Sequence, residues 1–118
     1  MRPSNKEISE AFATGNYKFA EAYLADNIVW NILGENPVVG KDAVLEVGKL
    51  SQLESFPTIT IKTVVSEGNY VVIESTGEAN TKNGQPYNQT YCDIYRFSEG
   101  KLQEITTYLD TELNNKTS

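Results

Sequence analysis

The sequence predicts an α+β domain in which helices cover one face of a curved, mostly antiparallel sheet. Apolar residues recur at helical spacing in the first half of the chain, and they alternate with polar residues from Thr58 onward. Asn83-Gly84 stands between two alternating runs, which is the strongest short-range signal of a β-hairpin. Helices followed by consecutive strands are typical of α+β domains.

The first helical segment begins at a capping box. Ser4 and Glu7 have the spacing with which two side chains cap backbone N–H groups at a helix start. Gly15 ends this helix, and Asn16 can cap a second one. The second helix is expected to bury one apolar stripe, formed by Phe19, Ala20, Tyr23 and Leu24.

One strand and a third helix follow. Ile28–Leu33 alternates and contains β-branched and aromatic residues, which favours a strand. A loop then leads to a helix predicted from Asp42 to about Ser55, ended by Pro57. Gly48 lies inside this helix, where glycine weakens helical structure and indicates close packing against another segment.

Beyond Pro57 the apolar period changes to two. Four consecutive strands joined by short turns are predicted, over residues 58–65, 70–82, 87–97 and 101–110. Residues from about 111 onward form a polar tail. No linker, repeat or low-complexity segment interrupts the chain, so one domain over residues 1–118 is expected.

The composition excludes several classes of function. The chain has no histidine, which excludes Ser-His-Asp and Cys-His catalysis and imidazole metal sites, and no metal or cofactor is expected. The net charge is −6 and Lys and Arg form no cluster, so nucleic acid is not an expected partner. Cys92 is the only cysteine and is expected to be a buried, inert thiol. No apolar run is long enough for a membrane span and the N-terminus does not resemble a signal peptide, so no membrane contact and a cytoplasmic location are expected.

Asp93 stands in the middle of the third of these four strands, and alternation decides which residues share its face. Tyr91 and Tyr95 do so within the same strand. A two-residue loop, which Asn-Gly favours, places Glu74 opposite Asp93 and Thr76 on the same face. A four-residue loop would place Thr76 opposite Asp93 and leave Glu74 and Thr76 on the face of Asp93. A three-residue loop would instead bring in the alternate set of Val71, Ile73, Ser75 and Ala79.

The order of the elements, together with short motifs, resembles a known superfamily. The motifs are Gly15-Asn16, Ile28-Val29-Trp30, Gly40-Lys41-Asp42-Ala43-Val44, Tyr91–Phe97, Glu99-Gly100-Lys101-Leu102, Tyr108 and Asp110. Over residues 5–110 the chain resembles the nuclear transport factor 2-like superfamily, and more narrowly its SnoaL-like group of polyketide cyclase-like and ketosteroid isomerase-like proteins. The resemblance implies a cystatin-like cone, in which three N-terminal helices and the curved sheet enclose a deep apolar pocket. It also implies a homodimer formed through the outer sheet face.

The resemblance further implies which face of the sheet points into the pocket. In ketosteroid isomerases the motif Asp-apolar-apolar-Arg-Phe carries its Asp into the pocket, and Asp93-Ile94-Tyr95-Arg96-Phe97 matches it. Asp93 is therefore expected inside as the catalytic group, where burial would raise its pKa. A second acid at Glu74 would move the pKa values of the two carboxyl groups, Asp93 and Glu74, further apart. The outward dimer surface is then expected to consist of Val71, Ile73, Ile94 and Tyr108.

Substrate contacts are expected from the face that carries Asp93 and from the second helix. The residues are Trp30, Ile32, Glu74, Thr76, Tyr91, Tyr95, Ile105, Thr107 and, on the helix, Tyr17. Ile8 and Ile32 stand where ketosteroid isomerases have their oxyanion tyrosine and general base, which disfavours that reaction. Arg96 has the wrong parity for the Asp-Arg-Asp arrangement of epoxide hydrolases.

The sequence thus predicts a pocket protein for a small apolar or amphipathic molecule. One interpretation is a cofactor-independent cyclase, isomerase or hydrolase that uses Asp93 as its acid–base group. The alternatives are a ligand-binding module without catalysis and a dimeric structural module with a vestigial pocket.

Overall fold

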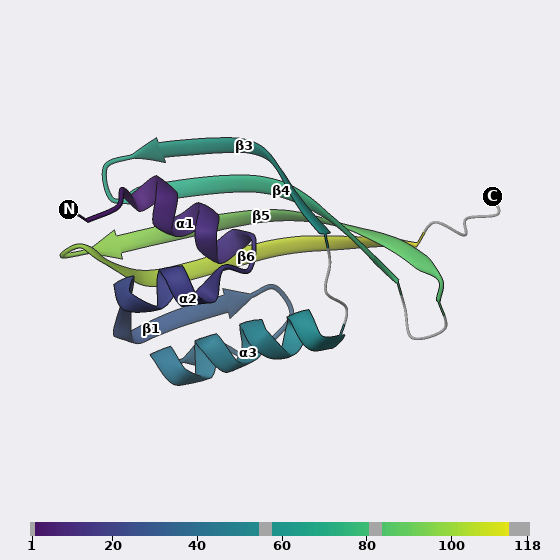
Figure 1. Ribbon diagram of the computed structural model, residues 1–118, viewed down its shortest axis with the longest axis horizontal. Helices are drawn as coiled ribbons and strands as arrows, with labels where there is room; N and C mark the ends of the chain where they lie inside the picture. Colours follow the sequence, from purple (N-terminus) through teal and green to yellow (C-terminus); the bar gives the residue numbers. More distant parts are fainter. Residues whose placement is uncertain (1, 55–57, 81–83, 114–118) are drawn as a thin grey trace.

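The described residues include six strands that form one curved sheet, and the helices lie against one of its faces (Figure 1). The computed structural model describes residues 2–54, 58–80 and 84–113. The strand order in this part of the chain is β2-β1-β6-β5-β4-β3, with β1 and β6 parallel and the other neighbours antiparallel. The predicted α+β class and the mostly antiparallel sheet are therefore confirmed.

Helix α1 (Asn5–Ala13) starts at the predicted capping box. The Ser4 hydroxyl accepts a hydrogen bond from the backbone N–H of Glu7 (3.1 Å), and the Glu7 carboxylate accepts one from the backbone N–H of Ser4 (2.9 Å). Gly15 adopts a φ of 89°, a left-handed conformation that favours glycine and turns the chain after the helix. These local signals lie within a few residues of each other, which is why the sequence predicts them.

Helix α2 (Tyr17–Ala20) is shorter than predicted. Asn16 caps it by accepting from the backbone N–H of Phe19, but the helix passes into a 3-10 turn, η1 (Glu21–Tyr23). Leu24 then already belongs to strand β1 (Leu24–Ile32), and Phe19 is 41% exposed. The predicted stripe is therefore wrong about the burial of Phe19, whereas Leu24 is buried as predicted but belongs to a strand instead of the helix.

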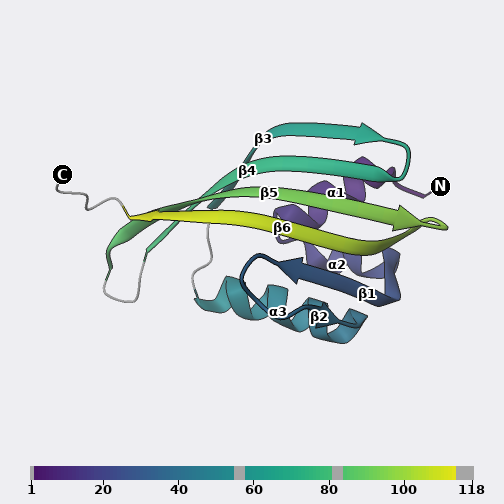
Figure 2. The same ribbon diagram turned by 180° about the vertical axis from the view of Figure 1, so that it is seen from behind.

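Helix α3 (Lys41–Glu54) follows the short strand β2 (Val38–Val39) and lies along the β1 edge of the sheet (Figure 2). Its close packing, which Gly48 predicts, is confirmed. A Cβ on Gly48 would lie 2.7 Å from Cζ of Tyr17, so the phenol ring of α2 fits only against a residue without a side chain.

The four long strands are β3 (Thr58–Glu67), β4 (Tyr70–Asn80), β5 (Pro86–Ser98) and β6 (Lys101–Leu113). Register shifts between Ile61 and Thr63 and between Arg96 and Phe97 mark bulges in this part of the sheet. Bulges increase local twist and bend the strand that carries them, which contributes to the curvature seen in Figures 1 and 2.

The register of the β4–β5 hairpin corrects the predicted loop. Asn80 pairs with Pro86, so residues 81–85, an odd number, lie between the strands instead of the expected two. Asp93 consequently stands opposite Ile73 rather than Glu74. The hydrophobic pattern explains the difference, because this register buries Val71 and Ile73 completely, whereas the expected one would have buried Glu74.

The face covered by the helices is the buried one. Its core includes Ile8 and Phe12 from α1, Val44 and Leu45 from α3, and Ile28, Val71, Ile73, Tyr95, Phe97, Leu102 and Ile105 from the strands. None of the described helices covers the outer face of β3 to β6 (Figure 2). Among the described residues, no helix combines the length and apolar character that crossing a membrane requires.

Candidate functional site

Asp93 lies on the helix-covered face, in the middle of β5. Its neighbours across the sheet are Ile73 on β4 and Thr107 on β6, and its side chain is only 8% exposed. The predicted inward orientation of Asp93 is therefore confirmed, although the residue opposite it is not the predicted one. A carboxyl group in such a position requires hydrogen-bond partners.

Two hydroxyl groups provide these partners. The Tyr95 hydroxyl donates to Oδ2 of Asp93 (3.1 Å), and the Thr107 side chain also hydrogen-bonds the carboxyl. Thr107 in turn accepts a hydrogen bond from the indole nitrogen Nε1 of Trp30 on β1 (2.9 Å). Four of the predicted site residues thus form one continuous network that joins β1, β6 and β5.

Aromatic rings surround this network on its helical side. Phe12 of α1 makes edge contacts with the rings of Tyr17, Trp30 and Tyr95, at centroid distances of 5.1, 5.2 and 6.2 Å. Such edge-to-face arrangements are the favoured geometry of aromatic pairs. Phe12 therefore ties the two helices to the strands that carry the polar network.

Burial sets the ionisation behaviour of the network. Desolvation raises the pKa of Asp93, while the hydrogen bonds from Thr107 and Tyr95 act in the opposite direction and lower it. Desolvation also raises the pKa of Tyr17, and the Asp93 charge adds to that effect. The pKa of Tyr95 lies well above its ordinary value for the same two reasons, so both phenols stay protonated.

The remaining predicted residues divide between the two faces of the sheet. Ile105 and Ile32 share the face of Asp93, since Ile105 pairs with Tyr95 and Ile32 with Thr107. Tyr91 is also on that face but is hydrogen-bonded to Gln89, further along the strand.

Glu74 and Thr76 lie on the outer face, which contradicts their predicted place in the site. Glu74 pairs with Cys92 and accepts a hydrogen bond from the Thr63 hydroxyl (2.9 Å), so it does not form an acid pair with Asp93. Arg96 has the outward parity that the sequence predicts, and its Nε bonds the Glu104 carboxylate (3.2 Å). The same hairpin register turns Val71 and Ile73 inward, so their expected outward positions are wrong.

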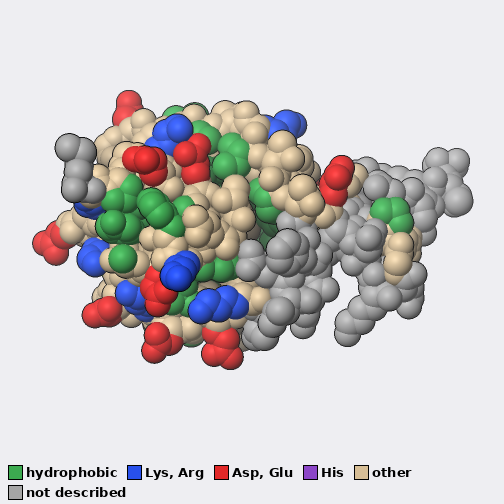
Figure 3. Space-filling model, in the orientation of Figure 1, with side chains coloured by type: hydrophobic (Ala, Val, Ile, Leu, Met, Phe, Trp, Pro, Cys, Tyr) green, Lys and Arg blue, Asp and Glu red, His purple; other side chains and the backbone are tan. Residues whose placement is uncertain are grey.

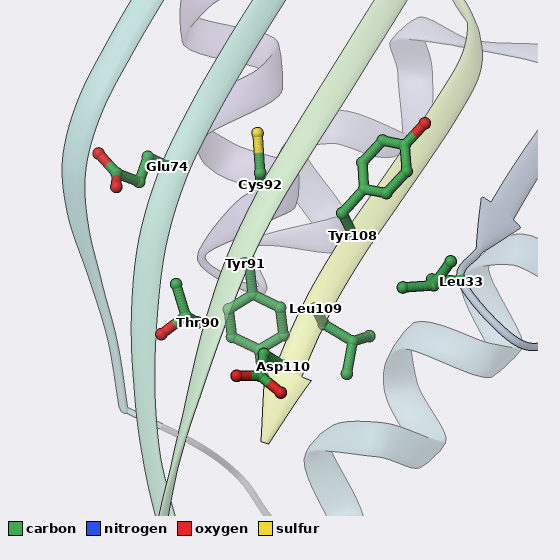
Figure 4. A pocket seen from close by; sticks show the side chains of 8 residues that line it. All are labelled: Leu33, Glu74, Thr90, Tyr91, Cys92, Tyr108, Leu109 and Asp110. Carbon is green, nitrogen blue, oxygen red and sulfur yellow. The ribbon is translucent and has the colours of Figure 1, made fainter. Parts of the chain in front are cut away.

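An open hollow of about 500 Å³ lies beside strands β4, β5 and β6 (Figure 4). The strand side chains that line it come mostly from the outward set, and Leu33 borders it at the end of β1. They are Glu74, Thr90, Tyr91, Cys92, Tyr108, Leu109 and Asp110. This hollow lacks Asp93 and its hydrogen-bond partners.

The described residues offer no group of three or more Cys, Asp and Glu side chains placed to hold a metal ion. On the helix-covered side, Lys and Arg side chains are interspersed with Asp and Glu over the described surface (Figure 3). The polar groups of the inner face are the carboxyl, hydroxyl and indole groups named above.

Two features of the site were missed by sequence reasoning. One is Ile73, which depends on the hairpin register. The other is Ser9 of α1, which is completely buried and whose Oγ has no hydrogen-bond partner among the described residues. The position of Ser9 next to Ile8 and three residues before Phe12 could have indicated that Ser9 shares the inward face of the helix.

A family model for the SnoaL-like domain matches residues 6–105. The chain belongs to this family. A search among curated proteins finds no match for the SnoaL-like domain described here. The family match confirms the resemblance from which the inward orientation of Asp93 is predicted.

Solved structures support the same fold. An NTF2-like protein of unknown function from Cytophaga hutchinsonii has 29% identity and a TM-score of 0.79, with 88% of this chain and 94% of that chain covered. A putative SnoaL-like polyketide cyclase from Jannaschia has 12% identity and a TM-score of 0.78, with 93% and 91% covered. An epoxide hydrolase of the LEH-like type from M. tuberculosis has 20% identity and a TM-score of 0.72, with 89% and 81% covered.

Proposed function

We propose that this SnoaL-like domain binds a small, largely apolar molecule on the inner face of its sheet and that Asp93 exchanges a proton with it. The observation that carries the proposal is the Asp93 carboxyl itself. It is buried beside aromatic rings, held by two hydroxyl groups, and has a raised pKa. A carboxyl whose pKa is raised toward the working pH is suited to both taking up and releasing a proton.

The proposed reaction is a proton transfer next to a carbonyl group. Ionised Asp93 takes a proton from the carbon beside the carbonyl, and the electron pair of the broken C–H bond moves into an enolate. In a cyclase-type reaction the enolate carbon attacks a second carbonyl of the same molecule, and protonated Asp93 returns the proton to the resulting alkoxide. In an isomerase-type reaction the same proton returns to a different carbon. Both cycles regenerate the carboxylate and need no cofactor.

One comparison and the residues of this chain favour the cyclase type. The similarity to a putative polyketide cyclase supports it. The residues argue against two other reactions, ketosteroid isomerisation and epoxide hydrolysis. Ile8 and Ile32 carry no proton-transfer group where ketosteroid isomerases have one. Arg96 bonds Glu104 on the outer face and so lies apart from Asp93, whereas epoxide hydrolases need an arginine beside the acid.

The test compares wild type with Asp93→Asn, using small polyketide-like and steroid-like carbonyl compounds. Binding is followed by chemical-shift changes of inner-face residues such as Ile105, and turnover by mass analysis of the product. Asp93→Asn should keep binding within a few-fold and lose turnover by at least about 100-fold, the contribution usual for an acid–base group. Equal turnover by both proteins would show that Asp93 is not the acid–base group.

A ligand-binding module without catalysis is the second candidate. The observation that favours it is that Asp93 already accepts hydrogen bonds from two protein hydroxyls. The acid–base role requires an Asp93 midpoint clearly above the ordinary Asp value of about 3.9. An NMR midpoint near that value would favour the binding module, whereas a raised midpoint is common to both candidates and leaves turnover by wild type and Asp93→Asn to separate them.

We further propose that the domain forms a homodimer through its outer sheet face. Val65, Tyr70 and Tyr108 are 56%, 51% and 48% exposed on that face, and exposed apolar side chains mark an interaction site where they form a patch. Arg96 and Glu104 neutralise each other on the same face. A second copy, despite the net charge of −6, would therefore meet exposed apolar side chains and a charge pair that is already neutralised.

Cys92 provides a test of the dimer. It is only partly buried, contrary to the expected buried thiol, and lies on this face between Glu74 and Tyr108. The rate at which a thiol reagent labels Cys92 should fall as protein concentration rises. Tyr108→Asp should remove that dependence and give a monomer by sedimentation, whereas Phe19→Asp, a change at an exposed aromatic outside the sheet, should not. A wild-type monomer at high micromolar concentration would contradict the proposal.

A further inference from the structure

The hydrogen bonds that lead to Asp93 begin at a group that can only donate. Trp30 Nε1 lies 2.9 Å from Thr107 Oγ1, and an indole nitrogen carries one hydrogen and accepts none. Thr107 must therefore be the acceptor in this bond. Its own hydroxyl hydrogen cannot be directed back to Trp30 and stays available for a different partner.

Asp93 is the partner that the register places beside Thr107. The two residues face each other directly across β5 and β6, on the same side of the sheet, and their side chains hydrogen-bond. Both are almost completely buried, at 8% and 5% exposed, so water does not readily replace either bond. The hydroxyl hydrogen of Thr107 is thus directed at the carboxyl oxygen.

We propose that Trp30 and Thr107 are positioning residues for Asp93, in which the indole orients the Thr107 hydroxyl so that it donates to the carboxylate. The consequence for catalysis rests on the function proposed above. With the Tyr95 hydroxyl on Oδ2, the carboxylate receives two donors from the protein and is held in one orientation. The acceptor positions that these two donors leave open are the ones that the proposed function assigns to the ligand.

The orienting bond also opposes the effect of burial. Desolvation raises the pKa of Asp93, and the Thr107 hydrogen bond is the larger of the two hydrogen bonds that lower it. Within the part of the chain that the structure describes, the titratable groups that interact with Asp93 are two phenols, Tyr95 on its own strand and Tyr17 on α2. The neighbours on β4 and β6, Ile73 and Thr107, do not titrate. Loss of the Thr107 donor should therefore move the Asp93 titration to higher pH.

The chain has a single tryptophan, so its indole N–H gives one NMR signal that needs no further assignment. In ligand-free wild type this signal should shift with pH and report the same midpoint as the Asp93 carboxyl carbon, because Thr107 links the two groups. Thr107→Val should raise the Asp93 midpoint by about one pH unit and abolish the pH dependence of the indole signal. Thr107→Ser should restore both.

Matched variants separate orientation from simple packing. Thr106→Val changes the neighbouring threonine, whose side chain lies on the opposite face of β6, and should leave the Asp93 midpoint unchanged. Trp30→Phe keeps the Thr107 hydroxyl but removes the orienting donor, and should raise the midpoint by less than Thr107→Val does. The proposal is overturned if Thr107→Val behaves like Thr106→Val, or if the indole signal of wild type does not follow the Asp93 titration.

These measurements use protein without ligand, so they are independent of turnover. If Asp93→Asn proves as active as wild type while the titrations come out as expected, the proposed function fails and the positioning role stands. If turnover depends on Asp93, Thr107→Val should shift its pH profile upward by the same amount as the NMR midpoint, and Thr107→Ser should not.

Discussion

Gly48 on α3 and Tyr17 on α2 are in closer contact than a residue with a side chain would permit. A Cβ at position 48 would lie 2.7 Å from Cζ and 3.0 Å from the hydroxyl oxygen of Tyr17. The hydroxyl end of this ring interacts electrostatically with Asp93. The absence of a side chain at Gly48 therefore lets the Tyr17 ring lie against α3, which fixes the position of its hydroxyl group relative to the Asp93 carboxyl.

Gly48→Ala should destabilise the domain, even though alanine favours helices by about 1 kcal/mol over glycine. Overpacking against the Tyr17 ring costs about 1–3 kcal/mol, so a net loss of about 1 kcal/mol in the free energy of unfolding is expected. Urea denaturation measures it. The cost should become a gain in the Tyr17→Leu background, where the end of the ring is absent. A loss of the same size in both backgrounds would show that Tyr17 is not the obstacle.

The helix starts and the approximate strands could be predicted because their causes lie within a few residues. Ser4 and Glu7 cap α1, and alternation places Tyr95 and Asp93 on one face without any knowledge of the neighbouring strands. The family resemblance then supplies the inward direction of that face. The residues on which each of these predictions depends lie within one short segment or one motif.

The register in which β4 pairs with β5 could not be predicted from the turn residues. Asn83-Gly84 favours a two-residue loop, but the free energy of burying Val71 and Ile73 outweighs the preference of two loop residues. Thr107 was predicted for the site from alternation along β6. Its bond to Trp30, however, depends on the parallel pairing of β1 with β6, which is non-local and has no signal in either strand.

Stability should depend on pH through Asp93. The folded-state pKa of this carboxyl is raised above the ordinary 3.8, so the folded protein holds a proton that the unfolded chain has already released between the two values. The free energy of unfolding therefore falls as pH rises through that window. Urea denaturation of wild type and Asp93→Asn from pH 4 to pH 8 isolates the effect, because all other groups are common to both. Wild type should lose stability relative to Asp93→Asn with rising pH, and a difference that is constant or grows in favour of wild type would contradict the raised pKa.

Phe12 should be one of the most costly residues to truncate. It is 4% exposed and its ring contacts Tyr17, Trp30 and Tyr95, so Phe12→Ala removes contacts with α2, β1 and β5 at once. The expected loss in the free energy of unfolding is about 3–5 kcal/mol, measured by urea denaturation. Phe19→Ala is the matched control, since Phe19 is 41% exposed, and should cost less than about 1 kcal/mol. Similar losses for the two variants would mean that the Phe12 contacts contribute little.

Ser9 and Ser4 should respond in opposite directions to the same chemical change. Ser9 is completely buried on α1, and its hydroxyl has no hydrogen-bond partner among the described residues, so it loses hydration without compensation. Ser9→Ala should therefore raise the free energy of unfolding by about 1 kcal/mol, since alanine also favours the helix. Ser4→Ala removes the bond to the Glu7 backbone N–H and should lower it by about 1 kcal/mol. Denaturation of both variants under one condition gives the comparison. A loss on Ser9→Ala would instead mean that the hydroxyl finds a partner in solution, such as a buried water between α1 and the sheet.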